Sequence, residues 1–270
     1  MHQEQYMKYT SANFQIHYLS SYTLLVKTDF IHDTLIVLDK EREIQVFHIY
    51  PSNEPDGDAM KLLGLPFQNV YVMLPSQSTV FIPGEVFRAE ELDTYQAFLL
   101  DENKNRTEIH TLDNMNITAC YQYDMLLHNR WKNIFPNAVF FTPFQAVLGQ
   151  IQTHVPLQGT VLGVHFTDVQ MDIYAFVNGQ FKAYQSFEIS NSNDLNYFVL
   201  TFCQAFYISL PVQKIVVSGI ELEHTYALSL KQFTKQITLI SELAYWKVDD
   251  GEVGRSLTEY QGTLDFVLCV

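Results

Sequence analysis

Apolar and polar positions follow one pattern twice along this chain, and each time the pattern predicts β-strands followed by a helix. In the first half, runs rich in Leu, Ile, Val and Thr predict three strands, at residues 22–30, 34–38 and 43–50. In the second half, residues 164–189 alternate across Asn178-Gly179, which is a strong hairpin signal. Apolar residues then recur at helical spacing from Leu195 to Phe206, which predicts an amphipathic helix.

The two halves align without a gap over the strand region. Residues 25–50 lie against residues 164–189, and the alignment pairs Thr28 with Thr167, Asp29 with Asp168, and Asp33 with Asp172. An internal repeat of this kind determines the architecture, and its order of three strands, a helix, a strand and a helix is that of the ribonuclease-H-like unit. We therefore predict an α/β protein with two lobes, residues 1–155 and 156–270, each a mixed β-sheet flanked by helices.

Further elements in the first half predict a small inserted subdomain at about residues 67–135. Apolar runs predict strands at residues 69–74, 79–83 and 117–123, and helices at residues 89–100 and 124–134. The polar run at residues 101–116 is expected to contain little regular structure. In the second half we expect a helix at 225–236, a polar loop at 249–262 and a last strand at 264–270.

Charge and cysteine content limit the partners and the compartment. The 270-residue chain carries a net charge of −14, which opposes nucleic-acid binding because that binding needs Lys and Arg to neutralise phosphates. Its three cysteines form no CxxC pair, and the N-terminus lacks the basic and apolar segments of a signal peptide. No apolar run approaches the roughly 18 residues of a membrane span. We expect a cytoplasmic protein that neither binds nucleic acid nor inserts into a membrane.

Several segments resemble known families. NVYVMLP, TVFIP and the acidic RAEELDTYQAFLL, within residues 69–100, resemble the small subdomain of PilM-type pilus-assembly proteins, which share the duplicated ribonuclease-H-like fold of actin, the Hsp70 ATPase domain and sugar kinases. STVFIPGEVF, HNRWKNIFPNAVFF and VNGQFKAYQSFEISNSNDLNYFVL resemble an uncharacterised bacterial family, a domain of unknown function with an actin-like fold. The resemblance implies this fold and no established substrate or partner.

The residues expected at the nucleotide cleft differ from those of nucleotide-using members. Those members hold phosphates with two glycine-containing hairpin turns, since glycine lets backbone N–H groups approach a phosphate closely. This chain has no glycine at residues 22–56 or 164–178, and the adenosine-binding Gly-Gly corresponds to Ser218-Gly219-Ile220. We also expect four carboxylates to repel a triphosphate where Mg²⁺ is absent: Asp29, Asp33, Asp168 and Asp172. The cleft is therefore predicted to be vestigial, without a cofactor.

Two alternatives keep the cleft active. In the first, the chain is an ATP-binding regulator or a slow ATPase that uses Mg²⁺ and an atypical phosphate loop. The resemblance then implies a cleft lined by Thr28, Asp29, His165, Thr167, Asp168, Ser218 and Gly219. In the second, the acidic cleft binds a ligand together with a divalent metal.

The Asp and Thr residues of both turns also have a purely structural interpretation. Such side chains commonly bond to the backbone of their own turn. A metal-dependent nuclease would need a further carboxylate, for which only Glu221 or Glu223 is available, and the nine histidines show no HxH, HxxxH or HExxH spacing. We predict no metal site.

The aromatic residues provide the remaining functional candidates. The chain contains 20 Phe, 16 Tyr and 2 Trp, and Tyr and Trp are enriched at interfaces. The segments at residues 131–144 and 244–248 either pack in the core or expose a patch for a partner. We predict a non-catalytic, actin-like protein that binds a protein partner or a second copy of itself.

Overall fold

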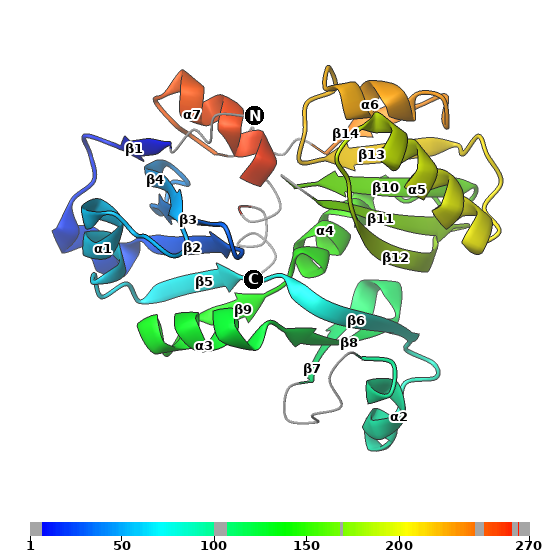
Figure 1. The fold of residues 1–270 in the computed structure, drawn as a ribbon, viewed down its shortest axis with the longest axis horizontal. Helices are drawn as coiled ribbons and strands as arrows, with labels where there is room; N and C mark the ends of the chain where they lie inside the picture. Colours follow the sequence, from blue (N-terminus) through cyan, green and yellow to red (C-terminus); the bar gives the residue numbers. More distant parts are fainter. Residues whose placement is uncertain (1–6, 100–106, 168–169, 241–245, 261–263, 265–270) are drawn as a thin grey trace.

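The computed structural model contains two lobes joined by a central helix (Figure 1). It describes the chain except for residues 1–6, 100–106, 168–169, 241–245, 261–263 and 265–270. No helix in the described part is long and apolar enough to cross a membrane.

The first lobe is built on a six-stranded sheet whose centre is a meander of three antiparallel strands. The order is β1 (Lys8–Thr10), β4 (Ile44–Pro51), β3 (His32–Leu38), β2 (Thr23–Thr28), β5 (Asn69–Met73) and β9 (Val139–Phe141). Strand β2 pairs in parallel with β5, and β5 with β9. The turn between β3 and β4 is stabilised by Asp39, whose carboxylate accepts hydrogen bonds from the backbone N–H groups of Glu41 and Glu43.

The second lobe has a five-stranded sheet with the same connectivity. The order is β12 (Gln180–Glu188), β11 (Gln170–Val177), β10 (Thr160–Phe166), β13 (Lys214–Ser218) and β14 (Ile237–Leu239). Helix α5 (Ser192–Ala205) begins at Asn191, whose side chain accepts hydrogen bonds from two backbone N–H groups. The mixed sheets, their shared strand order and the flanking helices confirm the predicted fold class, whereas the lobe boundary near residue 155 stays a prediction.

The turns of the two lobes do not correspond as the ungapped alignment predicted. In the turn between β2 and β3, the backbone N–H of Asp29 donates to the carbonyl of His32 at 3.1 Å. In the turn between β10 and β11, the backbone N–H of Thr167 donates to the carbonyl of Gln170 at 2.9 Å. Asp29 therefore corresponds to Thr167 and not to Asp168.

This one-residue shift also separates the two aspartates on the second strand of each hairpin. Asp33 pairs with Thr28, and the equivalent pair in the second lobe is Met171 with Phe166. Side chains alternate between the faces of a strand, so a shift of one residue moves a side chain to the other face. Asp33 and Asp172 consequently lie on non-equivalent faces of the two sheets.

The inserted subdomain is a three-stranded antiparallel sheet, and three predictions for it are corrected. Strand β5, predicted within the subdomain, pairs with β2 in the sheet of the first lobe. The strands of the subdomain are β6 (Ser76–Pro83), β8 (Ile117–Tyr123) and β7 (Glu108–Leu112). Strand β7 lies in the polar run that was expected to lack regular structure, because pairing with β8 supplies its backbone hydrogen bonds. The predicted helix at residues 89–100 is shorter, a 3₁₀ turn (Ala89–Glu91) followed by α2 (Leu92–Gln96). A second 3₁₀ turn spans Asp113–Met115.

The C-terminal part also differs from its prediction. Helix α6 spans only Thr225–Leu230, and the expected polar loop contains α7 (Gly251–Ser256) and a 3₁₀ helix (Leu257–Tyr260). Val253, Leu257 and Tyr260 have helical spacing and pack on the sheet of the first lobe, so a signal for this helix was present in the sequence. Of the predicted last strand, Leu264 is helical and residues 265–270 lie outside the described part.

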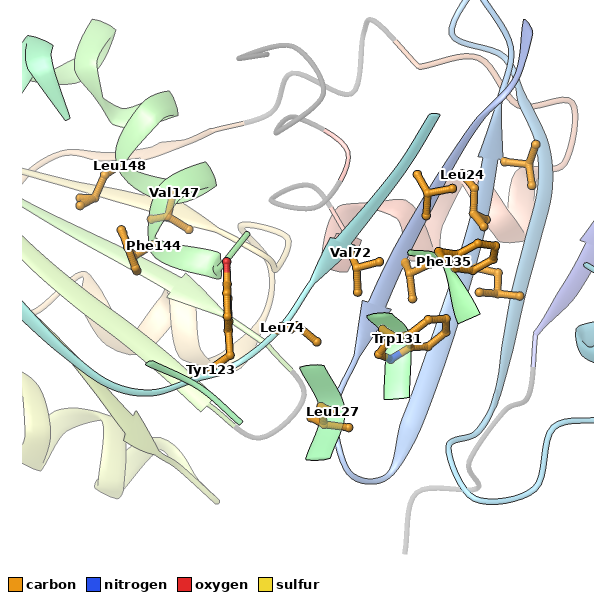
Figure 2. Packing of buried hydrophobic residues seen from close by; sticks show 14 of the residues in the cluster. Leu24, Val72, Leu74, Tyr123, Leu127, Trp131, Phe135, Phe144, Val147 and Leu148 are labelled. Carbon is orange, nitrogen blue, oxygen red and sulfur yellow. The ribbon is translucent and has the colours of Figure 1, made fainter. Parts of the chain in front are cut away.

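One hydrophobic cluster spans both lobes. Helix α3 (Met125–Ile134) contributes Trp131 to this cluster together with residues of strands β2 and β5, and Figure 2 shows its side chain next to Phe135. Helix α4 (Pro143–Ile151) connects the lobes and buries Phe144 in the same cluster. The cluster continues into the second lobe at Tyr174 and further residues of its sheet. The lobes therefore share a core.

Aromatic rings also connect the subdomain to the second lobe. The ring of Phe81 on β6 lies 5.3 Å from Phe144, 5.3 Å from Phe181 and 5.4 Å from Tyr184. Trp131 and Phe144 are at most 2% exposed and Trp246 is buried, so of the two alternatives for residues 131–144 and 244–248, these rings take the one in the core.

The first half also contains helix α1 (Gly57–Leu63) and a 3₁₀ helix at Ile16–Ser21, and a further 3₁₀ helix at Gln152–His154 follows α4. Helix α1 begins at Asp56, whose carboxylate accepts hydrogen bonds from Asp58 and Ala59 backbone N–H groups. The helix lies against the first lobe through Ala59 and Leu62.

Candidate functional site

The hairpin turn of the first lobe is occupied by its own aspartate. The carboxylate of Asp29 accepts hydrogen bonds from the backbone N–H of Ile31 at 2.6 Å and of His32 at 2.7 Å. These N–H groups point at a carboxylate oxygen, as they would at a phosphate oxygen. Asp29 therefore stabilises its own turn, in the way that the structural interpretation of the sequence predicts. Its carboxylate oxygen occupies the place where a phosphate oxygen would accept hydrogen bonds from these N–H groups.

Asp33 forms a buried ion pair that sequence reasoning missed. Its side chain has no exposed surface, and the guanidinium of Arg130 on α3 donates to it. The hydroxyls of Thr28 and Ser52 donate to the other carboxylate oxygen, at 2.5 and 2.9 Å. Asp33 is thus neutralised inside the lobe and does not face a triphosphate, which corrects the expectation of four repelling carboxylates.

The hairpin turn of the second lobe is held by Thr167. Its backbone N–H donates to the carbonyl of Gln170, and its hydroxyl accepts from the N–H of Gln170 at 3.3 Å. Asp168 lies outside the described residues, so its predicted place in the cleft stays a prediction.

The structure places His165 and Ser218, two residues of the alternative hypothesis of an active cleft, next to each other. They are neighbours on strands β10 and β13, with 2.9 Å between His165 Nδ1 and Ser218 Oγ. Both are buried. Burial, together with the smaller effect of the positive charge of Lys27 from the first lobe, lowers the pKa of His165 to about 4. The imidazole is therefore neutral near pH 7, and at this position a charge of the first lobe affects a side chain of the second.

Asp172 lies next to His165 on the neighbouring strand, but its hydrogen bond is to the strand on its other side. It pairs with His165 across β10 and β11, and it accepts a hydrogen bond from the hydroxyl of Ser186 on β12 at 2.5 Å. Burial raises the pKa of Asp172, and its hydrogen bonds with Ser186 and Tyr184 oppose this shift. The carboxylate of Asp172 is therefore buried and hydrogen-bonded within the sheet.

Gly219 is required by close packing at the end of β13. Its φ is +86°, and a Cβ atom there would lie 1.9 Å from the carbonyl oxygen of Phe166. The single glycine that the sequence retains at the adenosine motif therefore has a structural cause.

A metal site can be judged only within the residues that the structure describes. Among the described residues, no three His, Cys, Asp or Glu side chains form a group suited to a metal ion. A surface hollow of about 340 Å³ lies elsewhere, beside the β3–β4 turn, and its lining includes Tyr18, Tyr22 and Glu43 but none of the predicted cleft residues. Arg130, Ser52 and Ser186 were not found from sequence, since each contacts its aspartate only through the fold.

A family model described as "Protein of unknown function (DUF3822)" matches residues 58–237. Among solved structures, a protein from Bacteroides thetaiotaomicron with an actin-like ATPase fold and unknown function is similar, with a TM-score of 0.68, 15% identity, and coverage of 93% of this chain and 98% of that one. A PilM–PilN type IV pilus biogenesis complex is also similar, with a TM-score of 0.56, 10% identity, and coverage of 92% and 98%. No curated protein matches the chain. At sequence identities of 15% and 10%, the similarity to these two structures shows that the chain shares their fold.

Proposed function

The chain belongs to the family of proteins of unknown function DUF3822, and we propose that it is a non-catalytic member of the actin-like fold that acts by binding protein. The observation that carries the proposal is the Asp29 carboxylate, which occupies the backbone N–H groups of Ile31 and His32. A phosphate would have to displace a covalently attached anion from this turn. It would then lie beside the displaced carboxylate, whose charge repels it.

The shared core between the lobes supports the same proposal. Enzymes of two-lobed design commonly close around their ligands by a hinge motion, which needs an interface able to open. Here Phe144 of the connecting helix and Phe81 of the subdomain pack in an aromatic cluster with Phe181 and Tyr184 of the second lobe. Opening the lobes would expose these rings to water, at a cost of about 25 cal/mol for each Å² of apolar surface.

A protein-binding role is further supported by one structural neighbour. The similar pilus biogenesis structure is a complex of PilM with PilN, which shows that this fold serves in protein assembly in that case. We propose a role of the same general kind here, without a cofactor.

The test is thermal unfolding of the chain with Mg-ATP, Mg-ADP and Mg²⁺ alone. A ligand present at about 100 times its Kd stabilises the native state by about 2.7 kcal/mol, which raises Tm by about 5–10 °C for a chain of this size. We expect no nucleotide-specific shift. A shift of several degrees with Mg-ATP would overturn the proposal and favour the ATP-binding regulator.

Asp29→Gly serves as the matched variant because it removes the carboxylate and frees the two N–H groups. If Asp29 blocks the turn, this variant binds nucleotide at least as well as the parent chain. Tighter binding by the parent chain than by Asp29→Gly would mean that Asp29 contributes to nucleotide binding, and it would refute the structural argument directly.

A further inference from the structure

The surface hollow beside the β3–β4 turn combines aromatic rings with an excess of negative charge. Its volume of about 340 Å³ lies near the lower end of the range for small-ligand pockets. Tyr18 and Tyr22 supply the rings, and Tyr18 is 52% exposed. The charged residues of the lining are three acids and one base, namely Asp39, Glu41, Glu43 and Lys40.

The carboxylates of this hollow have no cation of their own. Within the described part of the chain, no ion pair involves Asp39, Glu41 or Glu43. Lys40 is exposed and forms none with any described residue either. A concave surface lined mainly by one sign of charge concentrates ligands of the opposite sign. The hollow therefore attracts a positively charged ligand.

Gln45, which also lines the hollow, adds an independent observation. It is 2% exposed, and its Nε2 donates a hydrogen bond to the carboxylate of Asp39 at 2.9 Å. This bond fixes the orientation of the amide, because the reverse orientation would set the amide oxygen against the carboxylate. Among the residues that the structure describes, the buried Oε1 of Gln45 has no hydrogen-bond partner, although buried polar atoms nearly always have one. This oxygen requires a donor that the described residues do not supply.

The backbone holds Gln45 and Asp39 in place before a ligand arrives. Strand β4 has one residue more than β3 at this point, and Gln45 is the extra residue of this β-bulge. Bulges redirect a side chain relative to the regular strand. The Asp39 carboxylate accepts hydrogen bonds from the backbone N–H groups of Glu41 and Glu43 at 2.8 and 2.9 Å. An amide oxygen and a carboxylate are thus fixed beside each other, which lowers the cost of ordering them on binding.

We propose that this hollow binds a guanidinium group, carried either by an arginine side chain or by a small guanidine. Guanidinium has five N–H donors and no acceptor, which suits a site that offers carboxylates and the Oε1 of Gln45. The planar cation also stacks on aromatic rings, whereas the ammonium of lysine is a compact and strongly hydrated charge.

The rim of the hollow can adjust to such a group. Lys40 and Glu41 are exposed there, and side chains of this kind commonly change rotamer on binding, which gives a donor access to Oε1. None of the lining residues belongs to the predicted nucleotide cleft, so this site and the proposed function can fail independently.

The experiment titrates the full chain with the peptide acetyl-Gly-Arg-Gly-amide and records ¹H–¹⁵N NMR spectra. The reporting signals are the backbone N–H groups of Glu41 and Glu43 and the side-chain NH₂ of Gln45. We expect a Kd of about 1–10 mM, because one side chain in an open hollow gains little free energy. Binding should weaken as NaCl rises from about 50 to 500 mM, since salt screens the attraction.

Matched probes test the chemistry of the ligand. A citrulline peptide has the shape of the arginine peptide without its charge, and we expect it to bind at least about fivefold more weakly. The lysine peptide should bind at least about twofold more weakly than the arginine peptide. Ethylguanidinium separates the two sources: equal affinity with the peptide assigns the site to a small guanidine, and weaker binding assigns it to arginine of a protein partner. Equal binding of the citrulline or lysine peptide, or no change at the reporting signals, would overturn the proposal.

Four variants locate the site. Glu43→Gln removes one carboxylate and is expected to raise the Kd of the arginine peptide about two- to fivefold. Glu90→Gln makes the same change of charge at an exposed position of the subdomain and is expected to alter Kd less than about 1.5-fold. Lys40→Met removes the positive charge of the lining and is expected to lower Kd about two- to threefold. Gln45→Met keeps the length of the side chain without Oε1 and is expected to raise Kd at least about twofold, with its Tm as a check on folding. Equal effects of Glu43→Gln and Glu90→Gln, weaker binding by Lys40→Met, or an unchanged Kd in a folded Gln45→Met would overturn the proposal.

Discussion

Removing the guanidinium of Arg130 tests how the first lobe holds its buried charge. In Arg130→Met an unbranched apolar side chain replaces the arginine stem, and Asp33 keeps its hydrogen bonds from Thr28 and Ser52. The carboxylate of Asp33 has no exposed surface, whereas the Arg130 side chain is 28% exposed. The variant therefore leaves an aspartate charge that water does not reach.

The expected magnitude follows from this difference in burial. Removing one partner of a buried ion pair costs about 3–5 kcal/mol. Since part of Arg130 contacts water and two hydroxyls remain on Asp33, we expect about 2–3 kcal/mol for Arg130→Met, which corresponds to a fall in Tm of about 5–10 °C. Asp33→Asn should cost less, about 1–2 kcal/mol, because the charge it leaves unpaired reaches solvent and the amide oxygen still accepts hydrogen bonds.

Urea unfolding of both single variants and of Asp33→Asn/Arg130→Met completes a double-mutant cycle. We expect the loss of unfolding free energy in the double variant to be smaller than the sum of the two single losses, by at least about 1 kcal/mol. Lys132→Met is the control, since this lysine is on the same helix and exposed, and its change is expected to stay within about 0.5 kcal/mol. Additive losses, or a larger loss for Asp33→Asn than for Arg130→Met, would refute the reasoning.

Two further predictions concern the row of residues at the end of the second-lobe sheet. Gly219→Ala should lower the free energy of unfolding by at least about 2–3 kcal/mol, because of its positive φ and the Phe166 carbonyl. Gly57→Ala, where nothing lies within 4 Å, should change it by less than about 1 kcal/mol, and equal losses in urea unfolding would contradict the packing argument. His165 has a pKa of about 4 in the folded chain against 6.5 unperturbed, so between these pH values the unfolded chain binds a proton that the folded chain does not. His165 contributes about 3 kcal/mol at most to the free energy of unfolding, and this contribution is lost as pH falls from about 6.5 to about 4. The free energy of unfolding of His165→Gln should therefore depend less on pH in this range. An unchanged pH dependence would show that His165 is not the group responsible.

Much of the fold was predictable because it depends on local periodicity. Alternation of apolar residues gave the three-strand meanders in both halves, and the recurrence of apolar residues from Leu195 gave α5. The end of α6 at Leu230 and the strand at Glu108–Leu112 were not predicted. In these places a tertiary contact, such as pairing with β8, outweighed the local preference of the residues.

The candidate site shows most clearly which features the sequence determined and which ones the tertiary structure decided. The absence of glycine from both turns is a property of the sequence alone, and it determined that neither turn has the backbone freedom typical of a phosphate loop. The partner of each aspartate was decided by the tertiary structure. Arg130 is 97 residues from Asp33 in the chain, and a one-residue difference in hairpin register placed Asp33 and Asp172 on different faces. Side-chain periodicity specifies which residues share a face, but only the packing of distant segments specifies what that face meets.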